Sequence, residues 1–182
     1  MALAGGAQIL QYRNKAATVA LRLKQALALR QLTREFDATF IVNDDIQLAL
    51  QAEADGVHLG MLDDGISVAR EVLGADKIIG ISCYNRLSLA RDAAHAGADY
   101  VAFGAFFSSA IKPDAAMVDI NLLQQARAEL DLPLVAIGGI TAHNGAALVS
   151  AGADALAVIS ALFDAADITA AAQDFSKLFI QN

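Results

Sequence analysis

Short apolar, β-prone runs recur along the chain, and most of them end in polar residues. The run at residues 40–42 passes directly into Asn43, Asp44 and Asp45. Such a run is typical of a buried parallel strand, whereas carboxylates are too costly to bury without partners. We therefore expect strands that bring polar side chains to one open end of a sheet or barrel. The predicted strands lie near residues 7–12, 38–42, 56–59, 77–81, 99–103, 133–137 and 154–159.

Helix-compatible segments alternate with these strands. The longest covers residues 16–36 and places apolar residues on one face at helical spacing, namely Val19, Leu23, Ala26, Leu27 and Leu32. The sequence Ala-Gly-Ala-Asp occurs at residues 96–99 and again at 151–154, and we interpret it as a repeated helix-to-strand corner rather than a binding motif. The other predicted helices cover residues 45–54, 64–74, 86–97, 119–130, 142–151 and 167–180.

The regular alternation of strands and helices with short links indicates a parallel sheet in an α/β protein. A doubly wound open sheet and a closed barrel both satisfy it. A TIM-type (β/α) barrel is favoured because no Gly-x-Gly-x-x-Gly follows the first strand and because polar residues follow nearly every strand. Only seven strands are recognisable, so the barrel is expected to lack its first strand, with residues 1–6 resembling the tail of a preceding helix. We expect one N-terminally short domain over residues 1–182, which starts further upstream or is truncated.

Composition and charge narrow the partners of this chain. Its 182 residues suffice for one core, and 56% of them are apolar. The net charge of −7 argues against nucleic acid and anionic membranes, and no run approaches the roughly 20 apolar residues of a membrane span. No signal peptide is recognisable, and the single Cys83 fits a reducing compartment. We expect a cytoplasmic protein with small-molecule partners, for which a homo-oligomer is compatible with the sequence.

Cations and an amide alternate where the first predicted strand ends. Gln11, Arg13 and Lys15 are two residues apart, so their side chains point to one side of a strand. Two cations suit a phosphate or pyrophosphate, which Arg binds as a fork and Lys as a point charge. A solvated strand end before the helix at 16–36 explains the same residues equally well.

Two carboxylates, Asp44 and Asp63, each come just after a predicted strand. Proteins usually hold Mg²⁺ with one or two carboxylates together with waters and substrate phosphate oxygens. The pair therefore predicts a magnesium site, although Asp63 alone also fits an ordinary loop residue. The neighbouring Asp45 and Asp64 are better explained as helix N-caps.

Glycines and a hydroxyl follow the last two predicted strands, at residues 138–141 and 158–161. Barrels of this kind commonly bind a phosphate there, through backbone N–H groups and a helix N-terminus. A tight turn would use the same two glycines. The longest irregular stretch, residues 104–117, contains Lys112, which could close over a bound anion or simply be solvated.

Four other side chains of reactive types are not expected to take part in the chemistry. His58 lies between two apolar residues, so we interpret it as a packed or hydrogen-bonded wall residue rather than a metal ligand. Cys83 has no base near it in the sequence and is not interpreted as a nucleophile. Tyr84 and Tyr100 are interpreted as structural residues.

A set of short motifs follows in fixed order along nearly the whole chain. They are Gln11-Tyr12-Arg13-Asn14-Lys15, Asn43-Asp44, Gly56-Val57-His58-Leu59-Gly60 with Asp63, Ile79-Gly80-Ile81-Ser82, residues 98–104, Lys112-Pro113, residues 136–140 and Val158-Ile159-Ser160. Each is short, but together they are specific, and they resemble the thiamine-phosphate synthase family. The resemblance implies a (β/α)₈ barrel enzyme, a transferase that joins a hydroxymethylpyrimidine pyrophosphate to a thiazole phosphate and releases pyrophosphate.

The resemblance also implies roles for individual residues. Those implied to bind substrates are Gln11, Tyr12, Arg13, Asn14, Lys15, Asn43, Ser82, Ser109, Ala110, Ile111, Lys112, Gly139, Ile159 and Ser160. Among them the implied catalytic residues are Arg13, Lys15, Lys112 and Ser82, with Ser82 at the pyrimidine end. Asp44 and Asp63 would hold Mg²⁺ on the pyrophosphate, and residues 109–111 would join Gly139, Ile159 and Ser160 at the thiazole phosphate.

One departure from the family concerns its Thr-x-Thr-Lys loop, which here reads Ser109-Ala110-Ile111-Lys112. Ile111 lacks a hydroxyl, and a hydrogen bond to a charged group is worth roughly 1.5–3 kcal/mol, or about 10- to 100-fold in binding. We therefore expect weakened binding of the thiazole phosphate. Two rival functions remain, a thiazole tautomerase-like isomerase and a non-catalytic relative that binds phosphate ligands.

Overall fold

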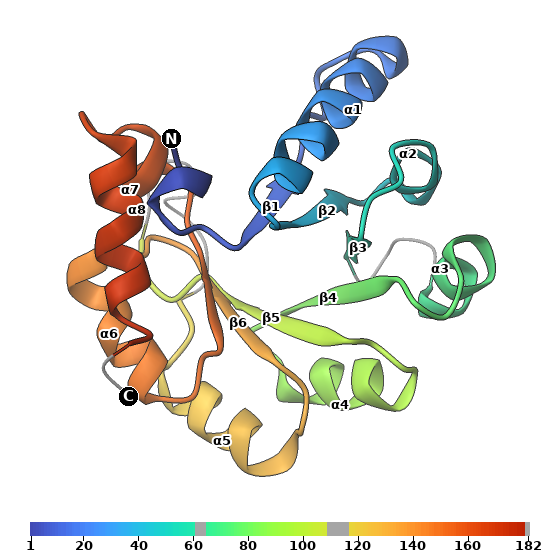
Figure 1. Cartoon of the computed structure of the whole chain (residues 1–182). Helices are drawn as coiled ribbons and strands as arrows, with labels where there is room; N and C mark the ends of the chain where they lie inside the picture. The colour runs from blue at the N-terminus through green and yellow to red at the C-terminus, as the bar shows by residue number, and fades with distance from the viewer. Residues whose placement is uncertain (61–64, 109–116, 181–182) are drawn as a thin grey trace.

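The computed structural model describes residues 1–60, 65–108 and 117–180. Seven parallel strands follow one another in sequence order and form one curled sheet with helices along its outer side (Figure 1). The strands are β1 (Ile9–Tyr12), β2 (Thr39–Asn43), β3 (Gly56–Leu59), β4 (Ile78–Tyr84), β5 (Tyr100–Gly104), β6 (Leu134–Ile137) and β7 (Ala155–Ala157). The helices are η1 (Leu3–Gly5), α1 (Val19–Glu35), α2 (Ile46–Gln51), α3 (Ile66–Leu73), α4 (Leu87–His95), α5 (Asn121–Glu129), α6 (Ala142–Ser150), α7 (Ser160–Phe163) and α8 (Ile168–Lys177). The predicted TIM-like α/β fold with seven strands is confirmed.

The structure corrects the predicted elements in three places. β4 runs to Tyr84, past the predicted end, so that Ser82 lies within the strand, and its register with β5 shifts between Ser82 and Tyr84. β7 covers only three residues, fewer than predicted. The short helix α7 was not among the predicted helices, because four residues are too few to show a helical period, whereas η1 lies within residues 1–6, which resembled the tail of a helix.

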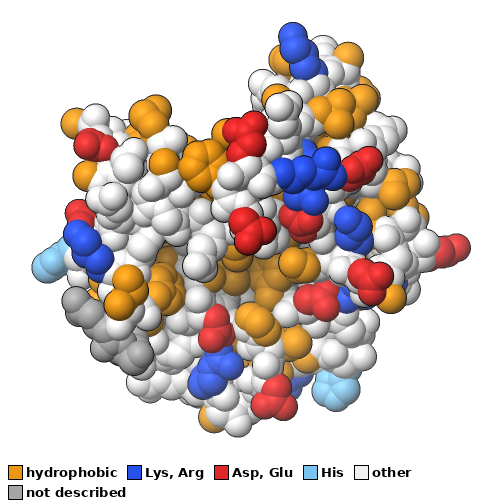
Figure 2. All heavy atoms as spheres, viewed as in Figure 1, with side chains coloured by type: hydrophobic (Ala, Val, Ile, Leu, Met, Phe, Trp, Pro, Cys, Tyr) orange, Lys and Arg blue, Asp and Glu red, His pale blue; other side chains and the backbone are white. Residues whose placement is uncertain are grey.

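Strand residues alternate between two different environments, as a pleated strand requires. Val57, Ile79 and Val101 face the helices and are completely buried. Asn43 and His58, which are partners in the register of β2 and β3, face the inside of the curled sheet and are half-buried. In Figure 2, hydrophobic side chains line a hollow in the middle of the view, with acidic and basic side chains beside it. The tight core therefore lies between sheet and helices, and the inner face stays accessible.

The sheet does not close on itself within the described part of the chain, where β1 pairs with β2 and β7 with β6. Ile9, on β1, is 54% exposed. The N-terminal turn η1 lies beside α8 (Figure 1), where Ser176 Oγ donates to the carbonyl of Gly5 at 3.4 Å. Within these described ranges, no helix is both long and apolar enough to cross a membrane.

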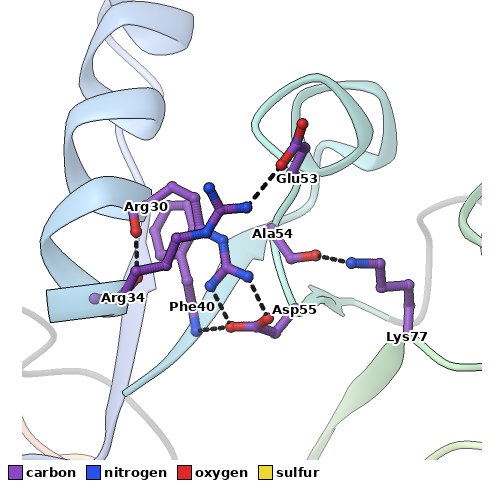
Figure 3. A network of polar contacts seen from close by, with 8 residues as sticks. Arg30, Arg34, Phe40, Glu53, Ala54, Asp55 and Lys77 are labelled. Carbon is purple, nitrogen blue, oxygen red and sulfur yellow. Dashed lines mark hydrogen bonds and ion pairs between the residues drawn. The ribbon is translucent and has the colours of Figure 1, made fainter. Parts of the chain in front are cut away.

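A repeated clamp of arginine and aspartate ties helices to the N-terminal ends of the strands. Arg30 of α1 donates two hydrogen bonds of 2.7 Å to the carboxylate of Asp55, which also accepts the backbone N–H of Phe40 at 2.8 Å (Figure 3). A similar arrangement, with one hydrogen bond from the arginine to the aspartate, recurs with Arg70, Asp99 and Ile79 and with Arg127, Asp154 and Leu134. The two Ala-Gly-Ala-Asp corners therefore end in clamp aspartates, which explains why this sequence is repeated.

The predicted apolar stripe of α1 is wrong in detail. Val19 is 69% exposed and Leu27 is 48% exposed, whereas Ala26 and Thr33 are fully buried. Small residues let this helix approach the sheet closely. Arg22 lies one turn before Ala26 and Arg30 lies one turn after it. Their side chains reach carboxylates at opposite ends of the strands, so the inner face of α1 is more polar than its sequence period suggested.

Candidate functional site

The residues that follow β1 and β2 line one shared cavity. Because the two strands are parallel neighbours, their C-terminal ends lie side by side. The cavity has a volume of about 360 Å³ and is lined by Tyr12, Arg13, Asn14, Lys15, Arg22, Asn43, Asp44, Asp45 and Leu48. Two predicted anion-binding cations are thus brought together with the predicted metal ligand Asp44 and with Asn43.

Lys15 and Asp44 form the ion pair at the centre of this arrangement. Lys15 Nζ lies 2.7 Å from Asp44 Oδ2, and the lysine side chain is 64% exposed. Asp44 adopts a left-handed backbone conformation with φ of 64°, and its N–H donates to the carbonyl of His58 at 2.8 Å. Non-glycine residues in this conformation are uncommon, although Asp tolerates it better than most. The turn ends β2 abruptly and directs the carboxylate toward Lys15.

Arg13 and Asn43 are the cavity residues with free side chains. Within the described residues, neither side chain has a hydrogen-bond or ion-pair partner. An exposed guanidinium beside a free amide, next to a lysine, offers donors to a bound anion without first breaking a protein contact. These two residues therefore keep their donors available for a ligand.

Tyr12 and Asn14 are engaged with α1 instead. The hydroxyl of Tyr12 donates to Gln25 Oε1 at 2.8 Å, and Asn14 Nδ2 donates to the same oxygen at 3.1 Å. Burial raises the pKa of Tyr12, an effect partly opposed by Arg22. These contacts fix the connection from β1 to α1 and thereby place Arg13 and Lys15. The sequence did not single out Gln25, since one amide on a helix carries no pattern of its own.

Asp45 caps α2, as predicted. Its Oδ1 accepts the backbone N–H of Leu48 at 2.9 Å, and its Oδ2 accepts from Arg22 at 3.0 Å. Arg22 is a cavity residue that was not predicted, although its position one turn before Ala26 on the buried face of α1 was a usable signal. Because Asp45 is engaged in both contacts, Asp44 is the freer of the two adjacent carboxylates.

Several predicted site residues lie outside the described residues. These are Asp63 and the loop residues Ser109, Ala110, Ile111 and Lys112. The predicted cap Asp64 lies outside the described residues as well. Among the described residues, no group of three or more His, Cys, Asp or Glu side chains could hold a metal ion. Of the two predicted metal ligands, only Asp44 lies among the described residues. One carboxylate beside cations still fits Mg²⁺, which keeps most of its waters and completes its shell with substrate phosphates.

A hydrogen-bonded cluster occupies the inner face of β3, β4 and β5. His58 Nδ1 lies 2.8 Å from the hydroxyl of Tyr100, and its Nε2 lies 2.8 Å from Ser82 Oγ. Burial lowers the pKa of His58 to about 4, despite the opposing charge of Asp44, and burial raises the pKa of Tyr100. His58 is therefore the hydrogen-bonded wall residue that the sequence predicted. It also links Tyr100 to Ser82, a predicted site residue.

Two elements near the other edge of the sheet carry the predicted phosphate-binding residues. Gly139 follows β6, whereas Ile159 and Ser160 lie after β7, with Ser160 opening α7. Thr141 caps α6 through the N–H of Asn144 at 3.3 Å. Gln11 lies on β1, exposed and outside the lining of the 360 Å³ cavity. The structure thus places the two groups of predicted substrate-binding residues at the carboxyl ends of different strands of one sheet.

The two glycines after β6 also serve the packing of the segment after β5. A Cβ on Gly138 would lie 2.3 Å from Ala105 Cβ, and one on Gly139 would lie 2.5 Å from the carbonyl oxygens of Phe107 and Ser108. Phe107 N–H donates to the Gly138 carbonyl at 3.0 Å. Both glycines have positive φ, so their identity follows from the turn as well as from any bound phosphate.

Comparisons with known proteins identify the relatives of this chain. The family described as thiamine monophosphate synthase matches residues 1–162. The thiamine-phosphate synthase of Methylobacillus flagellatus is 60% identical over 177 residues, covering 97% of this chain and 84% of that protein. The thiamine-phosphate synthase of Thiobacillus denitrificans is 56% identical over 178 residues, covering 98% and 84%.

A solved structure shows the same fold. The thiamine phosphate pyrophosphorylase of Pyrococcus furiosus superposes with a TM-score of 0.91 at 38% identity, covering 99% of this chain and 86% of that one. The prediction of a transferase enzyme of this kind is confirmed by these matches. The chain belongs to the thiamine monophosphate synthase family.

Proposed function

We propose that the diphosphate of a hydroxymethylpyrimidine substrate binds in the cavity at the ends of β1 and β2, and that the chain couples this pyrimidine to a thiazole phosphate. The observation that carries the proposal is the meeting of Arg13, Lys15, Asn43 and Asp44 in one cavity. Arg13 and Asn43 supply unengaged donors, and Lys15 supplies a second cation. A pyrophosphate group, which carries several negative charges, matches this set of donors.

The reaction requires a carbon–oxygen bond to break and a carbon–nitrogen bond to form. The bond from the pyrimidine CH₂ to the diphosphate oxygen breaks, and its electron pair leaves with the pyrophosphate. Arg13, Lys15 and Lys112 stabilise the negative charge that develops on the leaving group. The electron-rich aminopyrimidine bears the resulting carbocation, which the thiazole nitrogen captures. No side-chain nucleophile is needed, and holding the two rings in line lowers the barrier further.

Mg²⁺ is the ion that we propose for this site, held by Asp44 and Asp63 on the pyrophosphate. A bound magnesium ion would neutralise part of the charge of the leaving group. Lys15 pairs with Asp44 at 2.7 Å, and it can turn toward the diphosphate when the carboxylate contacts the ion, because its side chain is well exposed. The protein's own contribution is to place a carboxylate and a lysine so that both reach one diphosphate.

The thiazole phosphate is proposed to bind at the other end of the site, at Gly139, Ile159 and Ser160, with residues 109–111. The loss of a hydroxyl at Ile111 is expected to weaken this binding. Steady-state kinetics of Ile111→Thr test the point, with a lower thiazole KM or a higher kcat/KM expected. Unchanged values of both constants would show that the hydroxyl is not missed.

Release of pyrophosphate separates this function from its rivals. The chain is mixed with both substrates and Mg²⁺, and pyrophosphate and thiamine phosphate are measured together. The proposed reaction yields them in equal amounts. A tautomerase-like isomerase would convert the thiazole phosphate alone, and a phosphate-binding relative would yield neither product. We further propose that the chain acts in the cytoplasm on these small molecules, without a nucleic-acid partner.

A further inference from the structure

A chain of contacts joins Tyr100, His58 and Ser82 across the inner face of three strands. Tyr100 begins β5, His58 lies on β3, and Ser82 lies on β4 between them. The rings of Tyr100 and His58 stack with centroids 5.6 Å apart and planes inclined by 22°. Both ring nitrogens of His58 lie 2.8 Å from a hydroxyl oxygen.

Gly80 makes this chain of contacts possible. A Cβ at Gly80 would lie 1.9 Å from Tyr100 Cζ, so the tyrosine ring occupies the space that any side chain would need. The ring therefore crosses β4 at this glycine to reach His58 on the next strand. The φ of Gly80 is not in the left-handed region, so close approach alone explains the glycine.

The direction of the two hydrogen bonds follows from the donors and acceptors present. His58 Nδ1 is the one hydrogen-bond partner of the Tyr100 hydroxyl among the described residues, and a buried O–H without an acceptor is costly. Tyr100 therefore donates to Nδ1. A neutral imidazole then carries its proton on Nε2 and donates to Ser82 Oγ, since only one ring nitrogen is protonated. The hydroxyl proton of Ser82 is left to point into the open interior.

We propose that Tyr100 and His58 are positioning residues that fix Ser82 as a hydrogen-bond donor to a ring nitrogen of the pyrimidine. The inference rests on the proposed function, in which Ser82 lies at the pyrimidine end. Without Tyr100, the imidazole is free to move its proton to Nδ1 and to accept the hydroxyl proton of Ser82. The serine would then present only lone pairs to the substrate.

This direction predicts an unequal effect on the two kinetic constants. A donor to a ring nitrogen binds the electron-rich ground state better than the electron-poor carbocation, because cation formation lowers the basicity of the ring. Tyr100→Phe keeps the ring and loses the donor, so we expect the KM of the pyrimidine substrate to rise about fivefold, the value of one neutral hydrogen bond. We expect kcat to be unchanged or slightly higher, and the KM of the thiazole phosphate to stay the same.

Tyr84→Phe is the matched control. Tyr84 lies at the end of β4, is 49% exposed and lies outside the chain of contacts, so its variant should leave all three constants unchanged. An unchanged pyrimidine KM in Tyr100→Phe, in an enzyme that releases pyrophosphate, would overturn the proposal and leave the proposed function standing. A fall in kcat without a change in KM would overturn it too.

The protonation state of His58 tests the same inference without any substrate. Nitrogen-15 NMR of the imidazoles, assigned by comparison with His58→Gln because the chain has three histidines, reports which nitrogen carries the proton. We expect a protonated Nε2 and a bare Nδ1 in the wild type, and a shift toward protonated Nδ1 in Tyr100→Phe. A wild-type His58 protonated on Nδ1 would overturn the proposal. A wild type that released no pyrophosphate would overturn the proposed function, whatever the tautomer.

Discussion

Removal of the Asp55 carboxylate is expected to destabilise the fold far more than removal of its exposed neighbour Glu53. Asp55→Ala deletes two hydrogen bonds from Arg30 and one from the backbone of Phe40 (Figure 3). The Arg30 side chain is only 15% exposed, and its Nε is already buried without a partner, so the variant leaves a largely buried guanidinium unpaired. Loss of one partner of a fully buried pair costs about 3–5 kcal/mol. Because Asp55 is 30% exposed, solvent reduces the expected loss to about 2–3 kcal/mol.

Glu53→Ala is the matched control, because it removes an exposed carboxylate from the same network of polar contacts (Figure 3). Glu53 pairs with Arg34 at 2.7 Å, but the two side chains are 72% and 58% exposed, so the loss should stay below about 0.5 kcal/mol. Urea unfolding followed by far-UV circular dichroism suits a chain without tryptophan. With an m-value of about 2 kcal/mol/M, Asp55→Ala should lower the midpoint by about 1 M or more. Equal midpoints for the two variants would refute the clamp as a source of stability.

Three further outcomes follow from the structure. Burial lowers the pKa of His58 to about 4, below the 6.5 of an unfolded histidine, so the unfolded chain binds a proton that the folded chain does not. The free energy of unfolding should therefore fall by up to about 3 kcal/mol from pH 6.5 to 4, and it should fall less steeply in His58→Gln. Equal pH dependence of the two proteins in urea unfolding would contradict this. Gly139→Ala should displace the 105–108 segment and lower both stability and thiazole-phosphate affinity, as thermal unfolding and titration would show; unchanged values would mean that the turn has room. Cys83, buried with a pKa of about 12, should react with iodoacetamide only after unfolding, and rapid native labelling followed by mass spectrometry would disprove its burial.

The sequence predicted the fold and the ends of the strands because these follow from local patterns. Apolar runs that end in polar residues located β2 and placed Asn43 and Asp44 at its tip. The order of β-α units then implied a parallel sheet with those tips at one edge. What a residue does there was less predictable, because Tyr12 and Asn14 share the motif of Arg13 but bind Gln25 on α1.

Contacts across strands could not be predicted from local patterns. Tyr100 reaches His58 over Gly80, and this requires the register of three strands. The period of α1 likewise suggested that its leucines were buried. In the structure the face that carries Arg22 and Arg30 points inward instead, and these two arginines form ion pairs with Asp45 and Asp55. The Arg22 contact with the site depends on that rotation, so sequence period alone could not reveal it.

The account rests on a cation cluster that stabilises a departing diphosphate at the ends of β1 and β2. Single-turnover release of pyrophosphate, with both substrates and Mg²⁺ present, measures that step most directly. Arg13→Met removes a guanidinium that has no protein partner among the described residues, so folding should be unaffected. We predict that the release rate falls by about 10²-fold, the usual loss for one charge-stabilising donor. A rate equal to that of the wild type would contradict the central claim.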